Sequence, residues 1–414
     1  MNIAIILFAY PVLSETFVIN ELFQLQQRGV QGTIWREKQG NGAEHPKSQK
    51  LSFPIIDLPI HILGKNFTRL CRAHFQWLWR KPRIYLQTLW EVIHFFPDGE
   101  SLKIFLKSAV VAQQVEASSA ELIYVHESDR AYVFGLCVAR LCELPLILIF
   151  HTYYLFVVPR YIVAKVRTAD GLVFQSEYSR RYVDQLIPDN QQVPKMYVVS
   201  SPGVDTALFK PAIKKRVSTE KTKKLSLISV GRLEEAKGFQ FLIEAVALLK
   251  RKGWKVDCDI IGEGSLRQKL EQLIKKEQLT KEVKLHGALP HGRKLTALLQ
   301  QAEYFVLPSV QDSEGVHDVH PNAVKEAMAT ELIVVTTNLD SIDEVITHGV
   351  DGFIIQQATA ELITQQLIKV ALLSERTKTK IKQQARRKVT NLFDEGKMTT
   401  ALLEVFSQYV KKDV

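Results

Sequence analysis

The sequence is poor in cysteine, and the cysteines that it has form no recognisable motif. Its 414 residues contain only four of them, with no Cys-x-x-Cys spacing: Cys71, Cys137, Cys142 and Cys258. This pattern excludes a disulfide framework and a zinc site built from cysteine pairs. We expect free, buried thiols, which suit a reducing compartment.

The sequence also lacks an apolar run long enough to cross a membrane. Its longest apolar region, residues 144–158, contains His151 and is too short to span a bilayer as a helix. The apolar residues 3–9 have no cationic start and run into Tyr10-Pro11, so they do not predict a signal peptide. We expect a cytoplasmic protein, with contact at the inner face of the cytoplasmic membrane left open.

The net charge of +10 is not gathered in a nucleic-acid-binding motif, and we expect no nucleic-acid partner. It suits phosphorylated substrates or an anionic membrane surface. One region, residues 66–96, interleaves basic and aromatic side chains: Phe67, Arg69, Arg72, Phe75, Trp77, Trp79, Arg80, Lys81, Arg83, Tyr85 and Trp90. Such a mixture is typical of contact with an anionic membrane, although helices packed on a sheet with solvated arginines have the same composition.

The length of the chain and the regular alternation of apolar strands with helices predict two α/β domains. Residues 2–9 form a fully apolar strand, Ser14 or Thr16 can cap the following helix, and residues 32–35 start a second strand. This β-α-β unit begins a doubly wound parallel sheet. The alternation continues to the charged, aperiodic residues 214–224 and restarts at Leu225.

The predicted architecture is therefore two Rossmann-like domains that face each other across a deep cleft. We expect a first domain at residues 1–210, a charged linker at 211–224, a second domain at 225–392, and a C-terminal helix at 393–414 that packs back on the first domain. Ligands of such sheets bind at the carboxyl ends of the strands, so residues directly after strands are the candidates for function.

Two cations flank the start of a helix in the second domain. Gly231-Arg232 follows the strand at residues 225–230, and Lys237-Gly238 opens the next helix. A helix start presents free N–H groups and a positive dipole end, so this arrangement predicts a pyrophosphate site. Ordinary surface charge near a turn is the alternative interpretation.

Gly262-Glu263-Gly264 lies between the next strand and helix. A dinucleotide fingerprint would have a third glycine where this chain has Arg267, so binding of a nicotinamide dinucleotide is weakly supported. We interpret the segment as a tight turn whose glycines let a ligand approach the backbone.

Residues 307–329 place two carboxylates around another helix start. A strand at residues 304–307 is followed by a loop, Pro321 occupies a plausible first helical position, and the helix continues from Asn322. Asp318 precedes this helix and Glu326 lies inside it among small residues such as Ala323. Carboxylates at such a place can accept hydrogen bonds from sugar and ribose hydroxyls.

Histidines supply the remaining candidates. His151 stands at the carboxyl end of a strand, where a role in the site competes with a structural one, and His126 occupies a similar place. His317, Asp318 and His320 are clustered in a loop without an evident fourth ligand. We therefore expect no metal ion and no cofactor.

Taken together, the segments resemble the retaining glycosyltransferases of family 4, which have the GT-B fold. The resemblance covers nearly the whole chain. Its donor-domain motifs are Val230-Gly231-Arg232-Leu233, Lys237-Gly238-Phe239, Leu242-Ile243-Glu244-Ala245, Ile261-Gly262-Glu263-Gly264-Ser265-Leu266, His286-Gly287-Ala288-Leu289-Pro290, Phe305-Val306-Leu307-Pro308-Ser309 and His348-Gly349-Val350-Asp351-Gly352-Phe353. The N-terminal Pro11-Val12-Leu13-Ser14-Glu15-Thr16-Phe17 is similar to the branch that makes colanic acid and related exopolysaccharides or lipopolysaccharides.

The resemblance implies that a sugar passes from a nucleotide-diphosphate sugar to a glycan or lipid-linked acceptor, with retention at the anomeric carbon and without a metal. Arg232 and Lys237 would hold the diphosphate, Glu326 the ribose, and Asp318 and His151 would lie near the donor sugar. The first domain would bind the acceptor and the second the donor. Further donor contacts are expected at Gly231, Gly262, Glu263, Leu289, Pro321, Asn322 and Ala323, and acceptor contacts at Ser14, Glu15, Thr16 and His126.

One segment departs from the family pattern. The family usually has an acid, a glycine and an aliphatic residue before the proline, whereas this chain reads Asp318-Val319-His320-Pro321. The missing glycine removes a flexible position beside the sugar, and His320 is expected to add a bulky polar group there. Alternative functions therefore stay open: a degenerate protein that binds nucleotide sugars or partners without turnover, a nucleotide-sugar epimerase and, ranked last, a nicotinamide-dependent oxidoreductase.

Overall fold

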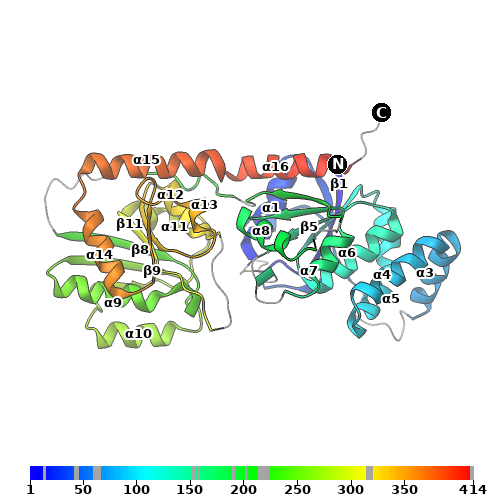
Figure 1. Cartoon of the computed structure of the whole chain (residues 1–414), viewed down its shortest axis with the longest axis horizontal. Coiled ribbons are helices and arrows are strands. Elements are labelled where there is room, and N and C mark those ends of the chain that lie inside the picture. Colours follow the sequence, from blue (N-terminus) through cyan, green and yellow to red (C-terminus); the bar gives the residue numbers. More distant parts are fainter. Residues whose placement is uncertain are drawn as a thin grey trace. The chain divides into compact units, whose positions relative to one another are not determined.

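The computed structural model describes residues 1–12, 15–41, 46–58, 67–151, 155–156, 159–188, 192–200, 203–212, 223–313 and 320–410. The chain divides into two compact units (Figure 1). The first unit comprises Met1–Pro202 together with Met398–Val414, and the second comprises Gly203–Lys397. The cleft expected between the two domains stays a prediction.

The first unit contains a seven-stranded sheet in the order β3-β2-β1-β4-β5-β6-β7. All of its strand pairs are parallel, as predicted from the alternation of strands and helices. The strands are β1 (Asn2–Tyr10), β2 (Gln31–Gln39), β3 (Ile55–Asp57), β4 (Leu122–His126), β5 (Leu146–Phe150), β6 (Gly171–Phe174) and β7 (Lys195–Val198). The helices are α1 (Thr16–Gln27), α2 (Pro46–Lys50), α3 (Phe67–Arg80), α4 (Pro82–Phe95), α5 (Gly99–Ala117), α6 (Asp129–Cys142), α7 (Ile162–Thr168) and α8 (Glu177–Gln185).

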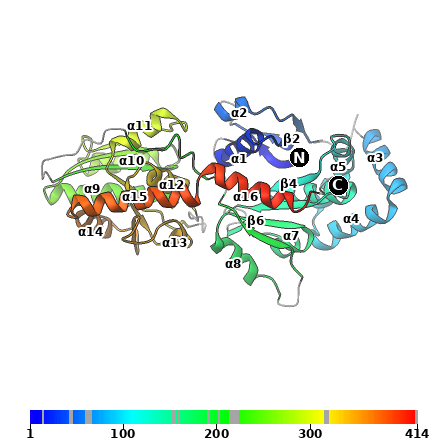
Figure 2. The same ribbon diagram turned by 90° about the horizontal axis from the view of Figure 1, so that it is seen from above.

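The apolar β1 is buried on both faces because helices cover both sides of this sheet. Ile3 and Ile5 pack in a cluster with α1 and the C-terminal end of α16 (Glu395–Ser407), which crosses the sheet in Figure 2. Ala4 and Ile6 point to the opposite face and pack with α5 and α6. Side chains alternate along a strand, so a run without polar residues is what a sheet covered on both faces requires.

The start of α1 differs from the prediction. The residue before the helix is Glu15, whose side chain makes no capping hydrogen bond, and Thr16 is the first helical residue. Thr16 is therefore not the N-cap, and Ser14, the other candidate, lies outside the described residues.

The second unit contains a six-stranded parallel sheet in the order β10-β9-β8-β11-β12-β13. Its strands are β8 (Lys224–Val230), β9 (Lys255–Ile261), β10 (Val283–Leu285), β11 (Tyr304–Leu307), β12 (Ile333–Thr337) and β13 (Phe353–Ile355). Its helices are α9 (Phe239–Arg251), α10 (Arg267–Lys276), α11 (Arg293–Gln301), α12 (Asn322–Ala329), α13 (Ile342–Val345), α14 (Ala360–Ala371) and α15 (Glu375–Leu392).

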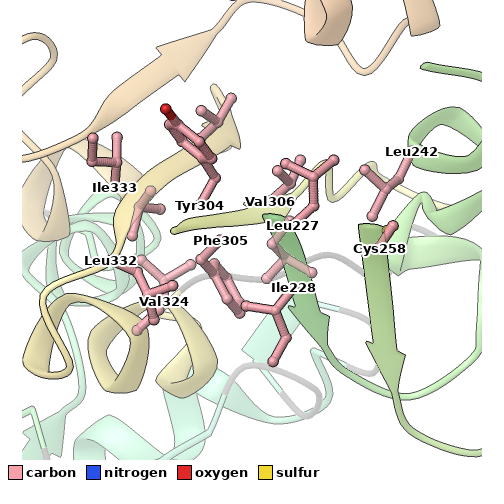
Figure 3. Close-up of a cluster of buried hydrophobic side chains, with 14 of the residues drawn as sticks. Leu227, Ile228, Leu242, Cys258, Tyr304, Phe305, Val306, Val324, Leu332 and Ile333 are labelled. Carbon is pink, nitrogen blue, oxygen red and sulfur yellow. The ribbon is translucent and has the colours of Figure 1, made fainter. Parts of the chain in front are cut away.

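The core of the second unit fixes the position of α12, the helix that carries Glu326. Figure 3 shows Val324 of α12 beside Phe305 of β11, with Ile228 of β8 close by. All three side chains are fully buried. Burying each side chain of this kind stabilises the fold by about 1.5–3 kcal/mol, so the helix start is held rigidly at the end of β11.

Among the described residues, no helix is both long enough and apolar enough to cross a bilayer.

Candidate active site

The loops that follow β8 and β9 are joined by backbone hydrogen bonds. The Gly231 N–H donates to the carbonyl of Ile261 (3.0 Å), and the Leu233 N–H donates to that of Glu263 (2.9 Å). Gly262 has φ +153°, and a Cβ there would lie 1.8 Å from the Gly231 carbonyl oxygen. A Cβ on Gly264 would lie 2.5 Å from the Leu233 carbonyl oxygen. The neighbouring loop fills the space that a side chain would need at these two positions, and the expected ligand contact at Gly262 stays a prediction.

Arg232 and Lys237 lie at the carboxyl end of β8. Arg232 is exposed and forms an ion pair with Glu234 (2.9 Å). The Cγ and Cδ atoms of Lys237 would lie 3.4 Å from a Cβ on Gly231, so its stem runs beside that glycine. Gly238 ends the turn with φ +63°, and a Cβ there would lie 2.0 Å from the Pro308 carbonyl oxygen. The exposed pair with Glu234 is weak, so an anionic ligand can replace it.

Glu263, an expected donor contact, is held by Arg267, the residue at the place of the missing third glycine. The two side chains form an ion pair, and Arg267 Nε also donates to Glu271 (2.9 Å). The Gly262 N–H donates to the Gly287 carbonyl (2.9 Å), which ties in the loop after β10. Leu289, further along that loop, is partly buried against the core.

The helix that carries Glu326 starts one residue later than expected. Pro321 is the N-cap of α12, with φ −64°, and Asn322 is the first helical residue. The Val324 N–H donates to the Pro321 carbonyl (3.1 Å), and Ala323 packs against the core. Asp318 lies outside the described residues, as do His317 and Val319.

Glu326 pairs with a histidine that the sequence did not single out. Its side chain is only 7% exposed, and its Oε1 lies 3.6 Å from Nε2 of His291. Burial raises the pKa of the Glu326 carboxyl group, while His291 and Lys325 oppose that rise. His291 directly follows the His286–Pro290 motif, and its ring contacts Phe209 edge-on at 5.9 Å. The pair can accept hydrogen bonds from vicinal hydroxyls and donate hydrogen bonds to them.

His320, expected as a bulky group beside the sugar, points into the interior of the unit. Its Nε2 lies 3.7 Å from Glu344 Oε2, and its ring meets Phe393 edge-on at 5.7 Å. Burial, together with Lys325 and Lys388, lowers the pKa of His320 well below its usual value. His320 is therefore a neutral interior residue, and the expectation of a protruding group was wrong.

In the first unit, His126 ends β4, His151 directly follows the neighbouring β5, and the two side chains contact each other. His126 Nδ1 lies 3.0 Å from His151 Nε2, and the rings stack at 5.1 Å. His126 Nε2 lies 3.1 Å from Glu21 Oε1, and its side chain is 5% exposed. Burial, and to a lesser degree His126, lowers the pKa of His151 well below its usual value. Both ring nitrogens of His126 are thus engaged inside the unit, which leaves none for the expected acceptor contact.

A buried charge network lies next to His151. The His151 N–H donates to Glu127 Oε2 (3.1 Å), while Lys165 Nζ lies 3.1 Å from Glu127 Oε1 and 2.9 Å from Asp129 Oδ1. Burial raises the pKa of Glu127 to about 7, and Lys165 opposes this rise. No sequence motif predicted a role for Lys165. Among the predicted acceptor residues, Glu15 is partly buried, which raises its pKa against the opposing effect of His126.

A pocket of about 580 Å³ opens at the N-terminal ends of α5 and α6. It combines an aromatic ring, guanidinium groups and carboxylates, and it is lined by Phe8, Asp98, Glu100, Ile104, Asp129, Arg130 and Arg160 among others. None of the predicted acceptor residues belongs to its lining. Within the described part of the chain, no three His, Cys, Asp or Glu side chains are grouped to hold a metal ion.

Comparisons with known proteins identify a domain in the second half of the chain. Residues 211–388 match the family model described as Glycosyl transferases group 1. The chain carries a group 1 glycosyltransferase domain. The putative colanic acid biosynthesis glycosyltransferase WcaL of Salmonella typhimurium is 25% identical over 410 residues, which cover 95% of this chain and 97% of that protein. The amylovoran biosynthesis glycosyltransferase AmsK of Erwinia amylovora is 35% identical over 147 residues, 36% of each chain. The protein is a glycosyltransferase, and the predicted resemblance is confirmed.

Solved structures confirm the fold class. The crystal structure of Anabaena Alr3699/HepE in complex with UDP gives a TM-score of 0.72 at 17% identity, covering 99% of this chain and all of that one. A glycosyltransferase from Rickettsia africae gives a TM-score of 0.71 at 15% identity, with 100% and 99% of the chains covered. The transferase therefore has the two-domain α/β architecture of GT-B enzymes, as predicted.

The contact between the loops after β8 and β9 predicts that Gly262→Ala destabilises the transferase. A Cβ at Gly262 would collide with the Gly231 carbonyl at 1.8 Å, so the loops must separate. We expect the free energy of unfolding of the second unit to fall by about 1–3 kcal/mol, measured by urea denaturation. Gly292→Ala is the control, because its nearest atom would be 4.0 Å away. Equal stability of the two variants would contradict this account of the loops.

The raised pKa of Glu127 predicts a pH dependence of stability. The folded state keeps the proton up to about pH 7, whereas an unfolded glutamate loses it near 4.5. Between these values the unfolded state binds fewer protons, so the free energy of unfolding falls as pH rises, by up to about 3 kcal/mol. Glu127→Gln should remove this slope in urea melts at pH 4.5–7, while the exposed Glu404→Gln should keep it. An unchanged slope in Glu127→Gln would refute the assignment.

Proposed function

We propose that the transferase moves a sugar from a nucleotide-diphosphate sugar to a glycan or lipid-linked acceptor, with retention of the anomeric configuration, during assembly of an exopolysaccharide or lipopolysaccharide. The observation that carries this proposal is the placement of Arg232 and Lys237 at the end of β8, in the same unit as the buried Glu326. The similar WcaL and AmsK proteins are named for colanic acid and amylovoran biosynthesis, which supports the polysaccharide assignment.

In this proposal the donor binds to the second unit. Arg232 and Lys237 hold the diphosphate and stabilise the negative charge that develops as the nucleotide departs. Their positive charge stabilises the leaving diphosphate as a metal ion would, so the proposal includes no metal and no cofactor. Crystals of the Anabaena HepE protein hold UDP or UDP-glucose, which supports a uridine or related nucleotide for a protein of this fold.

Glu326 and His291 provide the ribose contacts in this scheme. A buried carboxylate gains most from accepting hydroxyl hydrogen bonds, because it has little competing water. His291 lies 3.6 Å from the carboxylate and orients it. Asp318 and His151 are assigned to the donor sugar through the family motif.

The acceptor sugar is best accommodated by the pocket beside α5 and α6. Phe8 offers a flat apolar face, while Arg130 and Arg160 donate and Asp98 and Glu100 accept hydrogen bonds. A mixture of both charges suits neutral sugar hydroxyls better than a phosphate.

The epimerase alternative needs no acceptor, so product analysis without an acceptor distinguishes it. The interior position of His320 weakens the case for a degenerate protein.

Replacement of Arg232 or Lys237 by alanine tests the donor site. Each charged hydrogen bond to the diphosphate contributes about 1.5–3 kcal/mol, so we expect Kd for UDP or GDP to rise roughly 10- to 150-fold in either variant. Isothermal titration calorimetry measures this change, after a panel of UDP- and GDP-sugars has identified the donor. Arg251→Ala is the control, because Arg251 is exposed and pairs with Glu277 away from this loop. Nucleotide binding that survives both replacements would overturn the site.

We also propose that the α3–α4 pair contacts an anionic membrane surface. Helix α3 has two apolar stripes at helical spacing. Leu70, Ala73 and Trp77 are buried, whereas Phe75 and Trp79 are exposed, Trp79 to 79%. An amphipathic helix of a soluble domain needs only the inward stripe. An outward aromatic stripe is typical of interfacial helices.

Helix α4 repeats this arrangement. Leu86, Trp90 and Ile93 are exposed at i, i+4 and i+7, and Trp90 is 56% exposed. The acidic residue of the two helices is Glu91, which is buried and paired with Arg140 at 3.0 Å. The two helices therefore expose cations and aromatic rings but no carboxylate of their own, and Arg80 at the end of α3 pairs with Glu116 of α5 at 2.9 Å.

The cations of this surface support an anionic lipid as the partner. Arg69, Arg72 and Arg83 are exposed, and none of them forms an ion pair with another described residue. Such arginines lose little by facing water, but they gain from lipid headgroups of opposite charge. A lipid-linked acceptor would then be found at the same surface, which fits the proposed reaction.

Vesicle binding tests the membrane surface. The double variant Phe75→Ser/Trp79→Ser should reduce the partition coefficient onto phosphatidylglycerol vesicles about tenfold or more, since each aromatic contributes about 1.5–3 kcal/mol on burial. Flotation assays measure the bound fraction. Leu372→Ser is the control, because Leu372 is also strongly exposed but lies in the second unit. Equal binding to neutral phosphatidylcholine vesicles, or equal binding by both variants, would contradict the proposal.

A further inference from the structure

Behind His151 lies a line of buried polar side chains that comes from three elements. Tyr124 Oη donates to Glu21 Oε1 (2.8 Å), and His126 Nε2 lies 3.1 Å from the same oxygen. His126 Nδ1 in turn lies 3.0 Å from His151 Nε2. Phe17 packs on the other side of the His151 ring, with centroids 4.8 Å apart. The ring of His151 is therefore held in one orientation by contacts within the first unit.

The chemistry of these groups determines where the protons lie. An ionised carboxylate can only accept, so Glu21 accepts the hydrogen bond from Tyr124, and its negative charge 3.1 Å from His126 Nε2 favours the proton of His126 on that nitrogen. A neutral His126 then has a lone pair on Nδ1, which accepts the Nε2–H of His151. This assignment leaves a lone pair on Nδ1 of His151.

That lone pair has no partner in the line, whereas His126 Nε2, which also makes no hydrogen bond among the described residues, lies 3.1 Å from the Glu21 carboxylate. Nδ1 of His151 is a buried atom and has no hydrogen-bond partner among the described residues. A buried polar atom without a partner costs free energy, and such atoms in native proteins call for a functional explanation. The backbone of the same residue is fixed as well, because its N–H donates to Glu127 Oε2 (3.1 Å).

We propose that Glu21 and His126 are positioning residues that hold His151 with its proton on Nε2 and the lone pair on Nδ1 directed to a hydroxyl group of the sugar substrate. The inference rests on the proposed contact between His151 and the sugar. It replaces the predicted role of His126 in binding the acceptor, because Nδ1 of its ring contacts His151 and Nε2 contacts Glu21.

Glu21→Leu is the variant that tests this proposal. Without the carboxylate, an Nε2–H on His126 would be buried unpaired, so His126 should carry its proton on Nδ1 and donate it to His151 Nε2. His151 must then carry its own proton on Nδ1. Long-range ¹H–¹⁵N spectra of histidine-labelled full-length protein distinguish protonated from unprotonated ring nitrogens, and the spectrum of His151→Gln assigns the signals.

Two matched variants serve as controls. Glu21→Gln keeps an oxygen that can accept the His126 Nε2–H, and Tyr124→Phe leaves the contact between Glu21 and His126 in place. Both should retain the wild-type tautomer. In Glu21→Leu we expect kcat to fall about 10- to 100-fold, the usual effect of losing an outer-shell partner, with little change in KM for the donor. The controls should stay within about threefold of the wild type.

The outcomes separate this inference from the proposed function. A folded Glu21→Leu protein with the wild-type tautomer overturns the positioning role. A swapped tautomer with unchanged kcat overturns the use of the His151 lone pair. If the wild type transfers no sugar from any donor, the proposed function fails, while the spectra still decide the positioning role. Should Glu21→Leu fail to fold, Glu21→Leu/Tyr124→Phe removes both polar partners together and answers the same question.

Discussion

Parallel pairing of the strands is the constraint on which the rest of this structure depends. Every strand pair in both sheets is parallel. The carboxyl ends of neighbouring strands therefore meet at one edge, and each connection crosses a face of the sheet. This places Arg232, Gly262 and Gly287 in adjacent loops of one unit, and His126 beside His151 in the other. In an antiparallel sheet these residues would alternate between two edges.

Close packing of the loops adds a second constraint in the group 1 domain. Gly262 and Gly264 lie where a Cβ would collide with the backbone of the loop after β8, so the two loops form one interlocked support. The support leaves the Arg232 side chain exposed and fixes the stem of Lys237. Rigid placement of charge lowers a barrier without reorganisation during the reaction, which is what stabilisation of a leaving diphosphate requires.

The strands were largely predictable from the sequence because buried parallel strands are continuous apolar runs. The 19-residue α5 was missed, since its buried face includes Ser101, Lys107 and Ser108. The short edge strand β3 was missed as well, because only three residues pair there. Burial of polar side chains depends on partners distant in the chain, and no local pattern reports it.

The same reasoning explains which site residues the sequence supplied. Arg232 and His151 come within two residues of a strand end, and Lys237 comes two residues before the start of α9, so their places were predictable, whereas His291 and Lys165 acquire partners only through folding. One residue that was not predicted, Glu21, could have been recognised from its position in the sequence. Glu21 is 3% exposed and follows Phe17 by one helical turn, within the apolar stripe of α1. A carboxylate in such a stripe predicts a buried partner.

The departure from the family pattern at His320 can now be assessed on physical grounds. A third cation beside Lys325 and Lys388 would be costly in the interior, and burial keeps the His320 imidazole neutral through its lowered pKa. The same burial lowers the pKa of Lys325 to about 8, with Glu326 opposing the change, and Lys388 is paired with Asp351 at 3.5 Å. The His320 side chain thus packs inside the unit, against Glu344 and Phe393, next to the start of α12. The steric argument that rested on a protruding His320 is removed, while Val319, the other departure from the family pattern, lies outside the described residues.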